Sequence, residues 1–207
     1  MNRKRLITLA PLLAIAAFAV MPGPAQAVPH VYKNGVPGAE GKIVREVGWG
    51  TLTTLNEKLG SVECHAIRAG FDENPTGGGA AKGKVQAFTP YECNDPTCAT
   101  SLGEIKVTAG KLPWQTEASV PKAGEFGEKS NSVAITEDCT TIMEATFAGE
   151  VDPHIVAGIS IGSAPSSLIS EKEVLKNELK PEETLELKAR AAIQGFAAEE
   201  LLEIKDP

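Results

Sequence analysis

The sequence predicts a mainly β protein, an antiparallel sandwich or open barrel stapled by two disulfides. Apolar residues alternate with polar ones wherever the chain is periodic, which is typical of half-buried strands. The 20 glycines and 14 prolines divide the chain into short runs with turn signals between them. Four cysteines follow an N-terminal segment of the secretory type, a context in which cysteines form disulfides. We therefore expect one disulfide-linked β domain over residues 28–207.

The first 27 residues have the composition of a secretory signal peptide. Arg3–Arg5 is a basic head, Leu6–Val20 is an apolar run, and Ala25–Ala27 is a small-x-small cleavage site. The apolar run is short for a bilayer span and no later segment repeats it, so we expect no membrane-spanning segment. The sequence predicts cleavage after Ala27 and a secreted or extracytoplasmic protein.

The charge balance narrows the choice of partners. Removing the signal leaves 17 basic and 27 acidic residues, a net charge of −10. Nucleic acids and anionic lipids bind basic surfaces, so neither is an expected partner. The class of partner left open is a cell-wall or extracellular polymer, or another protein.

Strands are expected wherever period-two alternation is bounded by turn residues. Asn34-Gly35 has the composition of a tight hairpin turn near the start of the domain. The segments with strand periodicity are 41–55, 62–69, 85–91, 105–107, 133–135, 142–147, 155–161, 185–193 and 202–204. Eight or more short strands with turns between them favour a sandwich or a barrel.

One short helix near the C-terminus competes with the all-strand interpretation. Ser170–Glu173 has the pattern of a capping box, and Pro181 would end a helix after Lys180. Val174, Leu175 and Leu179 give this segment only a thin apolar stripe. The sequence therefore leaves open a surface helix over residues 170–180, followed by a charged loop.

Four cysteines allow three disulfide connectivities. Cys93 and Cys98 flank a turn-rich spacer, which favours a small loop between them and leaves Cys64 to pair with Cys139. The rival arrangement joins Cys64 to Cys93 across a hairpin centred on Gly77–Gly79, and Cys98 to Cys139. A zinc site is disfavoured because CxxC and HxxxH spacings are missing from the sequence, so no metal ligands are expected.

Two segments resemble ligand-binding loops and fail at a decisive position. Gly78–Lys84 matches the start of a phosphate-binding loop, but Val85 follows where a Ser or Thr must bind magnesium. Asp72–Gly77 resembles the start of a calcium loop, but Gly83 occupies the position of the bidentate glutamate. Both segments are interpreted as parts of a hairpin, and no cofactor is expected. The histidines have no metal-like spacing: they are His30, His65 and His154.

Aromatic side chains give the remaining indication of a binding site. Trp49 lies within an alternating strand and is expected in the core, whereas Trp114 follows Pro113 outside a clean alternation. We therefore predict an exposed Trp114 that is able to stack on a ligand such as a sugar ring. Tyr32 and Tyr91 are two further flat side chains.

Five different short motifs lie along the chain, at residues 30–36, 48–52, 73–80, 91–93 and 112–114. They read HVYKNGV, GWGTL, ENPTGGGA, YEC and LPW. Together they resemble a group of secreted β-rich proteins of soil actinobacteria along most of the predicted domain. The resemblance implies a lineage-restricted secreted β protein, and it implies no activity, cofactor or site residue.

The function expected from these features is a non-catalytic secreted or envelope-associated binding or structural protein. No assembled catalytic motif of the G-x-S-x-G or H-E-x-x-H type occurs in the sequence. The alternative is an extracellular polysaccharide or peptide hydrolase with two carboxylates facing each other across a cleft. A third possibility is an inhibitor of another protein that presents a disulfide loop around Cys93–Cys98.

Overall fold

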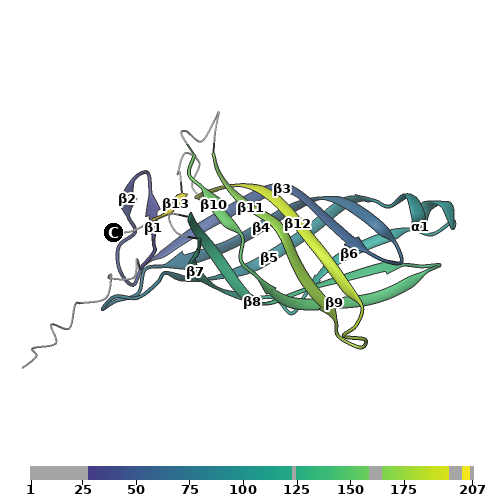
Figure 1. Ribbon diagram of the computed structural model, residues 1–207. Coiled ribbons are helices and arrows are strands. Elements are labelled where there is room, and N and C mark those ends of the chain that lie inside the picture. Colours follow the sequence, from purple (N-terminus) through teal and green to yellow (C-terminus); the bar gives the residue numbers. More distant parts are fainter. Residues whose placement is uncertain (1–27, 123–124, 159–164, 196–201, 206–207) are drawn as a thin grey trace, which may run out of the picture.

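The computed structural model describes residues 28–122, 125–158, 165–195 and 202–205 (Figure 1). The predicted signal peptide lies outside these residues, so its cleavage stays a prediction. The strands are β1 His30–Lys33, β2 Val36–Pro37, β3 Ile43–Asn56, β4 Gly60–Glu73, β5 Lys82–Asn94, β6 Ile105–Gly110, β7 Trp114–Lys122, β8 Glu125–Cys139, β9 Met143–Val151, β10 His154–Val156, β11 Ser166–Asn177, β12 Thr184–Gly195 and β13 Leu202–Lys205. The helix α1 spans Pro96–Thr100.

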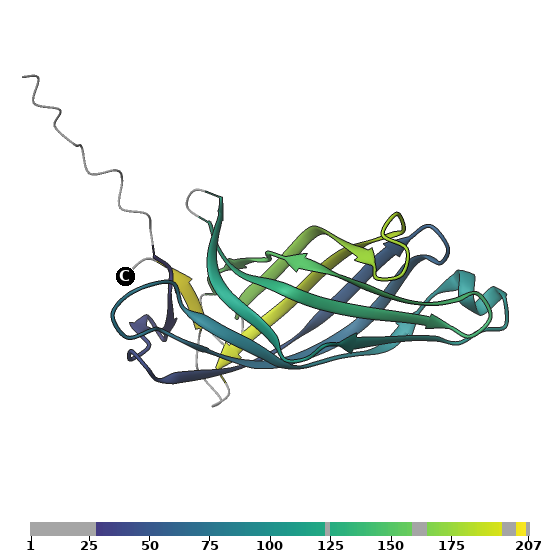
Figure 2. The same ribbon diagram turned by 90° about the horizontal axis from the view of Figure 1, so that it is seen from below.

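The large sheet closes on itself into a barrel. Its antiparallel pairings run from β10 through β11, β12, β3, β4, β5 and β7 to β8, and β8 pairs back with β10. β6 and β7 lie one after the other along one side of β8, as β9 and β10 do along the other side. The described wall is therefore eight strands around, with β6 and β7 sharing one position and β9 and β10 sharing another. Figure 1 and Figure 2 show the barrel from two sides. The predicted mainly β, antiparallel fold is confirmed.

Strict alternation places one face of each strand inside the barrel. In β3 and β4 the even-numbered residues are mostly buried and the odd-numbered ones mostly face outward. The register pairs Leu52 with Cys64, which both face inward, and Trp49 with Ile67, which both face outward. This period of two is the signal that the sequence carried.

The helix expected over residues 170–180 is wrong, because this segment forms most of β11. A bulge between Ser170 and Glu173 shifts the register against β12. The buried positions consequently change from even to odd numbers, with Ser170 before the bulge and Leu175 after it. Because the bulge interrupts the alternation, the apolar residues of this segment do not show the period of two that is typical of a strand.

The only short helix of the described chain lies earlier, at α1. Asp95 caps it by accepting a hydrogen bond from the Thr97 backbone nitrogen at 2.8 Å, and Pro96 occupies its first turn. The helix brings Cys98 against the end of β8.

Each end of the barrel is covered. At the end near the first described residues, the small sheet β13-β1-β2 packs Val31, Leu202 and Ile204 against the barrel. Asn74 holds this cover by bonding both the nitrogen and the carbonyl oxygen of Val31, at 2.8 and 3.0 Å. At the opposite end, α1 lies beside the β3–β4 and β8–β9 turns (Figure 1).

The apolar core fills the half of the barrel nearest α1. Its fully buried members include Leu52, Val62, Ile135, Phe147 and Leu175. Burying such side chains contributes roughly 1.5–3 kcal/mol each. This half is therefore the rigid part on which the rest of the interior is built.

The disulfide pairing favoured from the sequence is wrong, and the rival arrangement is the one observed. Cys64 bonds Cys93 and Cys98 bonds Cys139. The β4–β5 ladder places Cys93 beside Cys64, because His65 pairs with Tyr91 and Glu63 with Asn94. The spacer between Cys93 and Cys98 begins a helix and does not close a loop, so the two cysteines reach different partners.

The predicted tight turn at Asn34-Gly35 is confirmed. β1 and β2 pair through Lys33 and Val36, and both turn residues have positive φ, at 51° and 74°. The glycines at positions 77–79 join β4 to β5, as the hairpin interpretation expected. The strand expected at 155–161 is observed over β10, and residues 159–161 lie outside the described chain.

Within the described residues, no helix has the length and apolar character that crossing a membrane requires.

Removing the Cys98–Cys139 bond by the double substitution Cys98→Ser and Cys139→Ser should lower the free energy of unfolding by about 2–4 kcal/mol. The bond closes a sequence separation of 41 residues, and its loss frees the unfolded chain. Denaturant unfolding without reductant measures the change. Peptide mapping of the unreduced protein is the control, and a Cys64–Cys139 peptide would contradict the structure.

Candidate functional site

A cavity of about 90 Å³ lies inside the barrel, between the apolar core and the end covered by β1 and β13. One wall carries little side-chain volume, because five of the residues that β12, β3 and β4 present there are glycine or alanine. These are Gly48, Gly50, Ala66, Ala189 and Ala191. The opposite wall carries the large rings of Phe88 and Trp114. The cavity therefore results from pairing a glycine-and-alanine wall with an aromatic one.

The glycines of this wall are required by the close approach of β3 to its neighbours. A Cβ atom on Gly50 would lie 1.9 Å from the backbone oxygen of Arg190 on β12. On Gly48 it would lie 2.8 Å from Cγ of Arg68. Any side chain at these two positions would displace backbone or the buried arginine.

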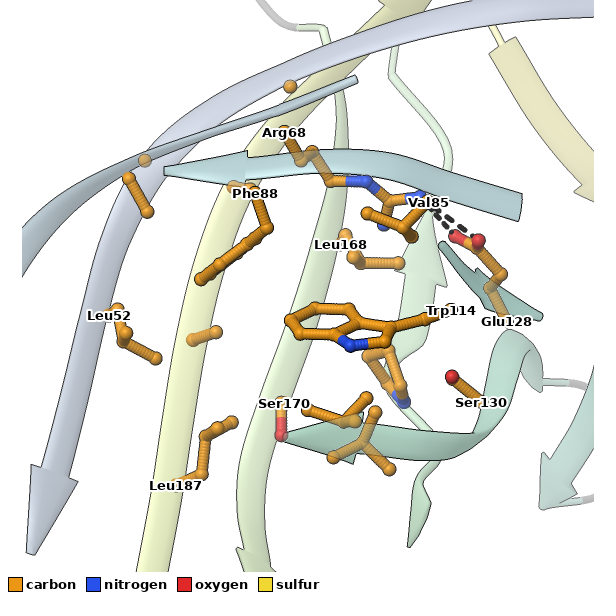
Figure 3. A pocket seen from close by; sticks show the side chains of 18 of the residues that line it. Leu52, Arg68, Val85, Phe88, Trp114, Glu128, Ser130, Leu168, Ser170 and Leu187 are labelled. Carbon is orange, nitrogen blue, oxygen red and sulfur yellow. Dashed lines mark hydrogen bonds and ion pairs between the residues drawn. The ribbon is translucent and has the colours of Figure 1, made fainter. Parts of the chain in front are cut away.

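Trp114 is buried, contrary to the prediction that its ring is exposed. Its side chain is 5% exposed and lines the cavity, where its ring lies 5.3 Å from that of Phe88 (Figure 3). The indole nitrogen donates to the backbone oxygen of Gly110 at 2.8 Å, so the ring faces remain for apolar contact. Trp49, expected in the core, is 44% exposed on the outer face of β3.

Four buried polar atoms at the cavity lack hydrogen-bond partners among the described residues. They are Arg68 Nε and the hydroxyl oxygens of Thr116, Ser130 and Ser170. Each side chain belongs to a different strand of the wall: β4, β7, β8 and β11. A buried polar group without a partner costs about 1–3 kcal/mol. Four such groups around one apolar space form a pre-arranged set of donors and acceptors.

Arg68 also anchors a buried ion cluster at the covered end of the cavity. Its Nη2 atom donates to both carboxylate oxygens of Glu128, at 3.0 and 2.8 Å, and to Glu46. Asp72 is buried close by on the same strand as Arg68. Figure 3 shows the Arg68–Glu128 pair beside the cavity rings. One guanidinium thus faces three buried carboxyl groups.

This crowding determines which of the carboxyl groups hold protons. Burial raises the pKa of Glu46 to about 7, although Arg68 opposes the shift. Burial, with the carboxylates of Glu46 and Glu128 nearby, raises the pKa of Asp72 well above its usual value. Burial alone would lower the pKa of Arg68, but the carboxylates of Glu128 and Glu46 raise it by more, to above its ordinary value. The guanidinium therefore stays charged. Glu46 therefore holds a proton in mildly acidic solution.

A second buried polar cluster closes the other end of the core. Glu137 is fully buried and accepts hydrogen bonds from Thr54 and Asn56. Burial raises the pKa of Glu137, while these two hydrogen bonds oppose the shift. Asn56 also accepts from the backbone nitrogens of Lys58 and Leu59, so this cluster is tied to the β3–β4 turn. The cluster therefore joins the end of the core to this turn and has a structural role.

The histidines and cysteines named from the sequence do not come together. His30 contacts the Gly79 carbonyl oxygen at 3.2 Å, His65 lies on β4, and His154 lies on β10. All four cysteines are in disulfides. The described part of the chain contains no group of three potential metal ligands among His, Cys, Asp and Glu.

Sequence reasoning missed the residues that define the cavity. The usable signal was parity: Arg68 and Asp72 occupy the same alternating positions of β4 as Val62 and Cys64. Charged residues on the apolar face of a strand indicate a buried polar cluster. Glu46 on β3 carries the same signal.

Comparison with known proteins finds no matching family, no matching curated protein and no matching solved structure.

The ion cluster makes stability fall as the pH rises. Between Glu46's ordinary pKa of 4.5 and its folded value of about 7, the folded chain keeps a proton that the unfolded chain has lost. At roughly 1.4 kcal/mol per pH unit, the free energy of unfolding should be about 2–3 kcal/mol lower at pH 8 than at pH 5.

Denaturant unfolding of the disulfide-intact protein at the two pH values measures this difference. Glu46→Gln should reduce it, because the amide cannot ionise, while Asp72 and Glu137, whose pKa values burial also raises, keep their own contributions. Glu144→Gln, on the exposed part of β9, is the matched control and should keep it. An unchanged pH dependence in Glu46→Gln would refute this role of the cluster.

Proposed function

We propose that this chain is a secreted binding protein whose barrel interior holds a small neutral molecule with an apolar body and a hydrogen-bonding group. The observation that carries the proposal is the convergence of four buried, partnerless polar atoms on one apolar cavity. Ligand sites in proteins commonly combine apolar walls with a few placed polar groups in this manner.

The energetic cost of the arrangement supports a ligand. A core of similar shape made only of apolar side chains would avoid the desolvation of Arg68 and of the three hydroxyl groups. A bound molecule that pairs with these groups recovers that cost. Water is the competing occupant, because buried water commonly bridges such groups.

The size and charge of the cavity restrict the ligand class. A cavity of about 150 Å³ accommodates benzene. This cavity has about 90 Å³, so its ligand is smaller than benzene. Arg68 already faces the carboxyl groups of Glu46 and Glu128, so an anionic group on the ligand would meet like charge. The polar end of the ligand is therefore neutral, such as a hydroxyl or carbonyl group. Its apolar body packs on the Trp114 ring, which is the stacking role proposed for this residue.

Export of the protein is part of the same proposal. The N-terminal segment has signal-peptide composition, and two disulfides are compatible with an extracytoplasmic location. Membership of a secreted actinobacterial group and the carboxylate-pair hydrolase both stay predictions from the sequence. The two carboxylates beside the cavity, Glu46 and Glu128, are both bound to Arg68.

2-Propanol, which has two methyl groups and one hydroxyl group and is smaller than benzene, is a suitable probe for the cavity. It should produce saturable shifts in the amide NMR signals of cavity residues. Ala189→Leu should weaken binding more than tenfold, because the larger side chain occupies the cavity. Thr116→Val should weaken it roughly fivefold to tenfold through loss of one hydrogen bond of about 1 kcal/mol.

Thr89→Val is the matched control, because Thr89 faces outward on β5 and should leave affinity unchanged. Thermal unfolding of each variant verifies that it is folded. Absence of saturable shifts in the unmodified protein would contradict the proposal. Equal affinity in Ala189→Leu would place the probe elsewhere and contradict it as well.

A further inference from the structure

A second hollow lies on the outer face of the barrel and is separate from the interior cavity. It has a volume of about 420 Å³ and spans β3, β4 and β5. The side chains that face it are mainly polar: Thr51, Thr53, Glu63, His65, Glu92 and Asn94. This volume is in the range of sites that hold a molecule the size of a sugar unit or larger. The groove is therefore a candidate site independent of the interior.

A bulge in β5 builds this groove. Glu63 pairs with Asn94 and His65 pairs with Tyr91, so two residues of β5 oppose the single residue Cys64. One of the two, Glu92, has a left-handed backbone with φ of 50°. A non-glycine residue in this conformation is uncommon and is enriched at functional positions. The bulge brings the Glu92 carboxylate to 3.9 Å from Nε2 of His65.

The Cys64–Cys93 disulfide fixes the bulge from the adjacent positions. Cys93 is the second residue of the bulge, and its bond to Cys64 ties β5 to β4 there. The positions of Glu92 and Asn94 on either side of Cys93 are consequently held against β4. The groove is thus pre-formed by covalent and backbone structure.

Two exposed aromatic rings lie on the outer face that carries the polar groove, outside the residues that line it. The Tyr91 side chain is 40% exposed, and its ring lies 5.6 Å from that of His65. Trp49 is exposed one strand away, where it pairs with the exposed Ile67, two residues from the Thr51–His65 pair. Flat apolar surfaces therefore lie on the same outer face as a hollow rich in hydrogen-bonding groups.

We propose that this groove binds a pyranose unit of a neutral extracellular polysaccharide. A pyranose has an apolar C–H face, which suits the Tyr91 and Trp49 rings, and a rim of hydroxyl groups. Carboxylates at Glu63 and Glu92 accept hydrogen bonds from hydroxyl groups, while Asn94 both donates and accepts. The same two carboxylates repel acidic sugars, which restricts the class to neutral polymers. The site is independent of the ligand proposed for the interior.

The test is co-sedimentation of the protein with insoluble cellulose, β-1,3-glucan, xylan and chitin, with polygalacturonate as the acidic polymer. We expect binding to at least one neutral polymer, reversed by its soluble oligosaccharide. Tyr91→Ala and Trp49→Ala should each lower the affinity roughly tenfold, through lost ring contact. Glu92→Gln should lower it less, because the amide oxygen still accepts hydrogen bonds.

Val174→Ala is the matched control, since Val174 is exposed on β11 away from the groove, and it should bind as the unmodified protein does. Binding of 2-propanol inside the barrel should be the same in all these variants, which separates this site from the interior one. Three results would overturn the proposal. The first is binding to none of the neutral polymers, and the second is binding only to polygalacturonate. The third is binding by the Tyr91→Ala and Trp49→Ala variants that is as tight as that of the unmodified protein.

Discussion

The buried guanidinium of Arg68 is the interaction on which the barrel interior depends. Its charge cannot be removed by deprotonation, so the surrounding strands must neutralise it. Glu46 from β3 and Glu128 from β8 do so, which joins three parts of the wall through one side chain. Gly48 is needed next to it because a Cβ there would collide with the arginine. The polar end of the cavity is therefore built around this residue.

The cavity exists because two sequence features oppose each other across the barrel. The strands β12, β3 and β4 contribute glycine and alanine where a well-packed core would have leucine or valine, and β5 and β7 contribute rings that cannot reach across. The rest of the interior follows ordinary packing, with Phe147 and Leu175 fully buried in the half near α1. The proposed binding site is therefore separated from most of the apolar core along the barrel axis: the apolar half packs around Phe147 and Leu175, and the half beside Arg68 carries the unsatisfied groups.

The sequence predicted the class of fold because alternation directly reports a half-buried strand. It did not predict closure of the sheet, since the β8–β10 pairing depends on the position of strands distant in the chain. The helix expected near residue 170 failed because a bulge breaks the alternation, and the bulge is a property of the β11–β12 ladder. Trp49 is predicted in the core because it lies within an alternating strand, and Trp114 is predicted to be exposed because it follows Pro113; neither prediction considers which face of its strand the residue occupies. The alternating positions of Val44 and Leu52 already place Trp49 on the outer face of β3.

The most direct measurement of the central claim is a high-resolution crystal structure of the protein grown with 2-propanol. The account predicts the alcohol inside the barrel, with its methyl groups against Trp114 and its oxygen within hydrogen-bond distance of Arg68 Nε or one of the three hydroxyl groups. A cavity occupied only by ordered water that pairs with all four polar groups would contradict it. Hydroxyl groups of Thr116, Ser130 and Ser170 bonded to neighbouring backbone around a closed interior would contradict it equally.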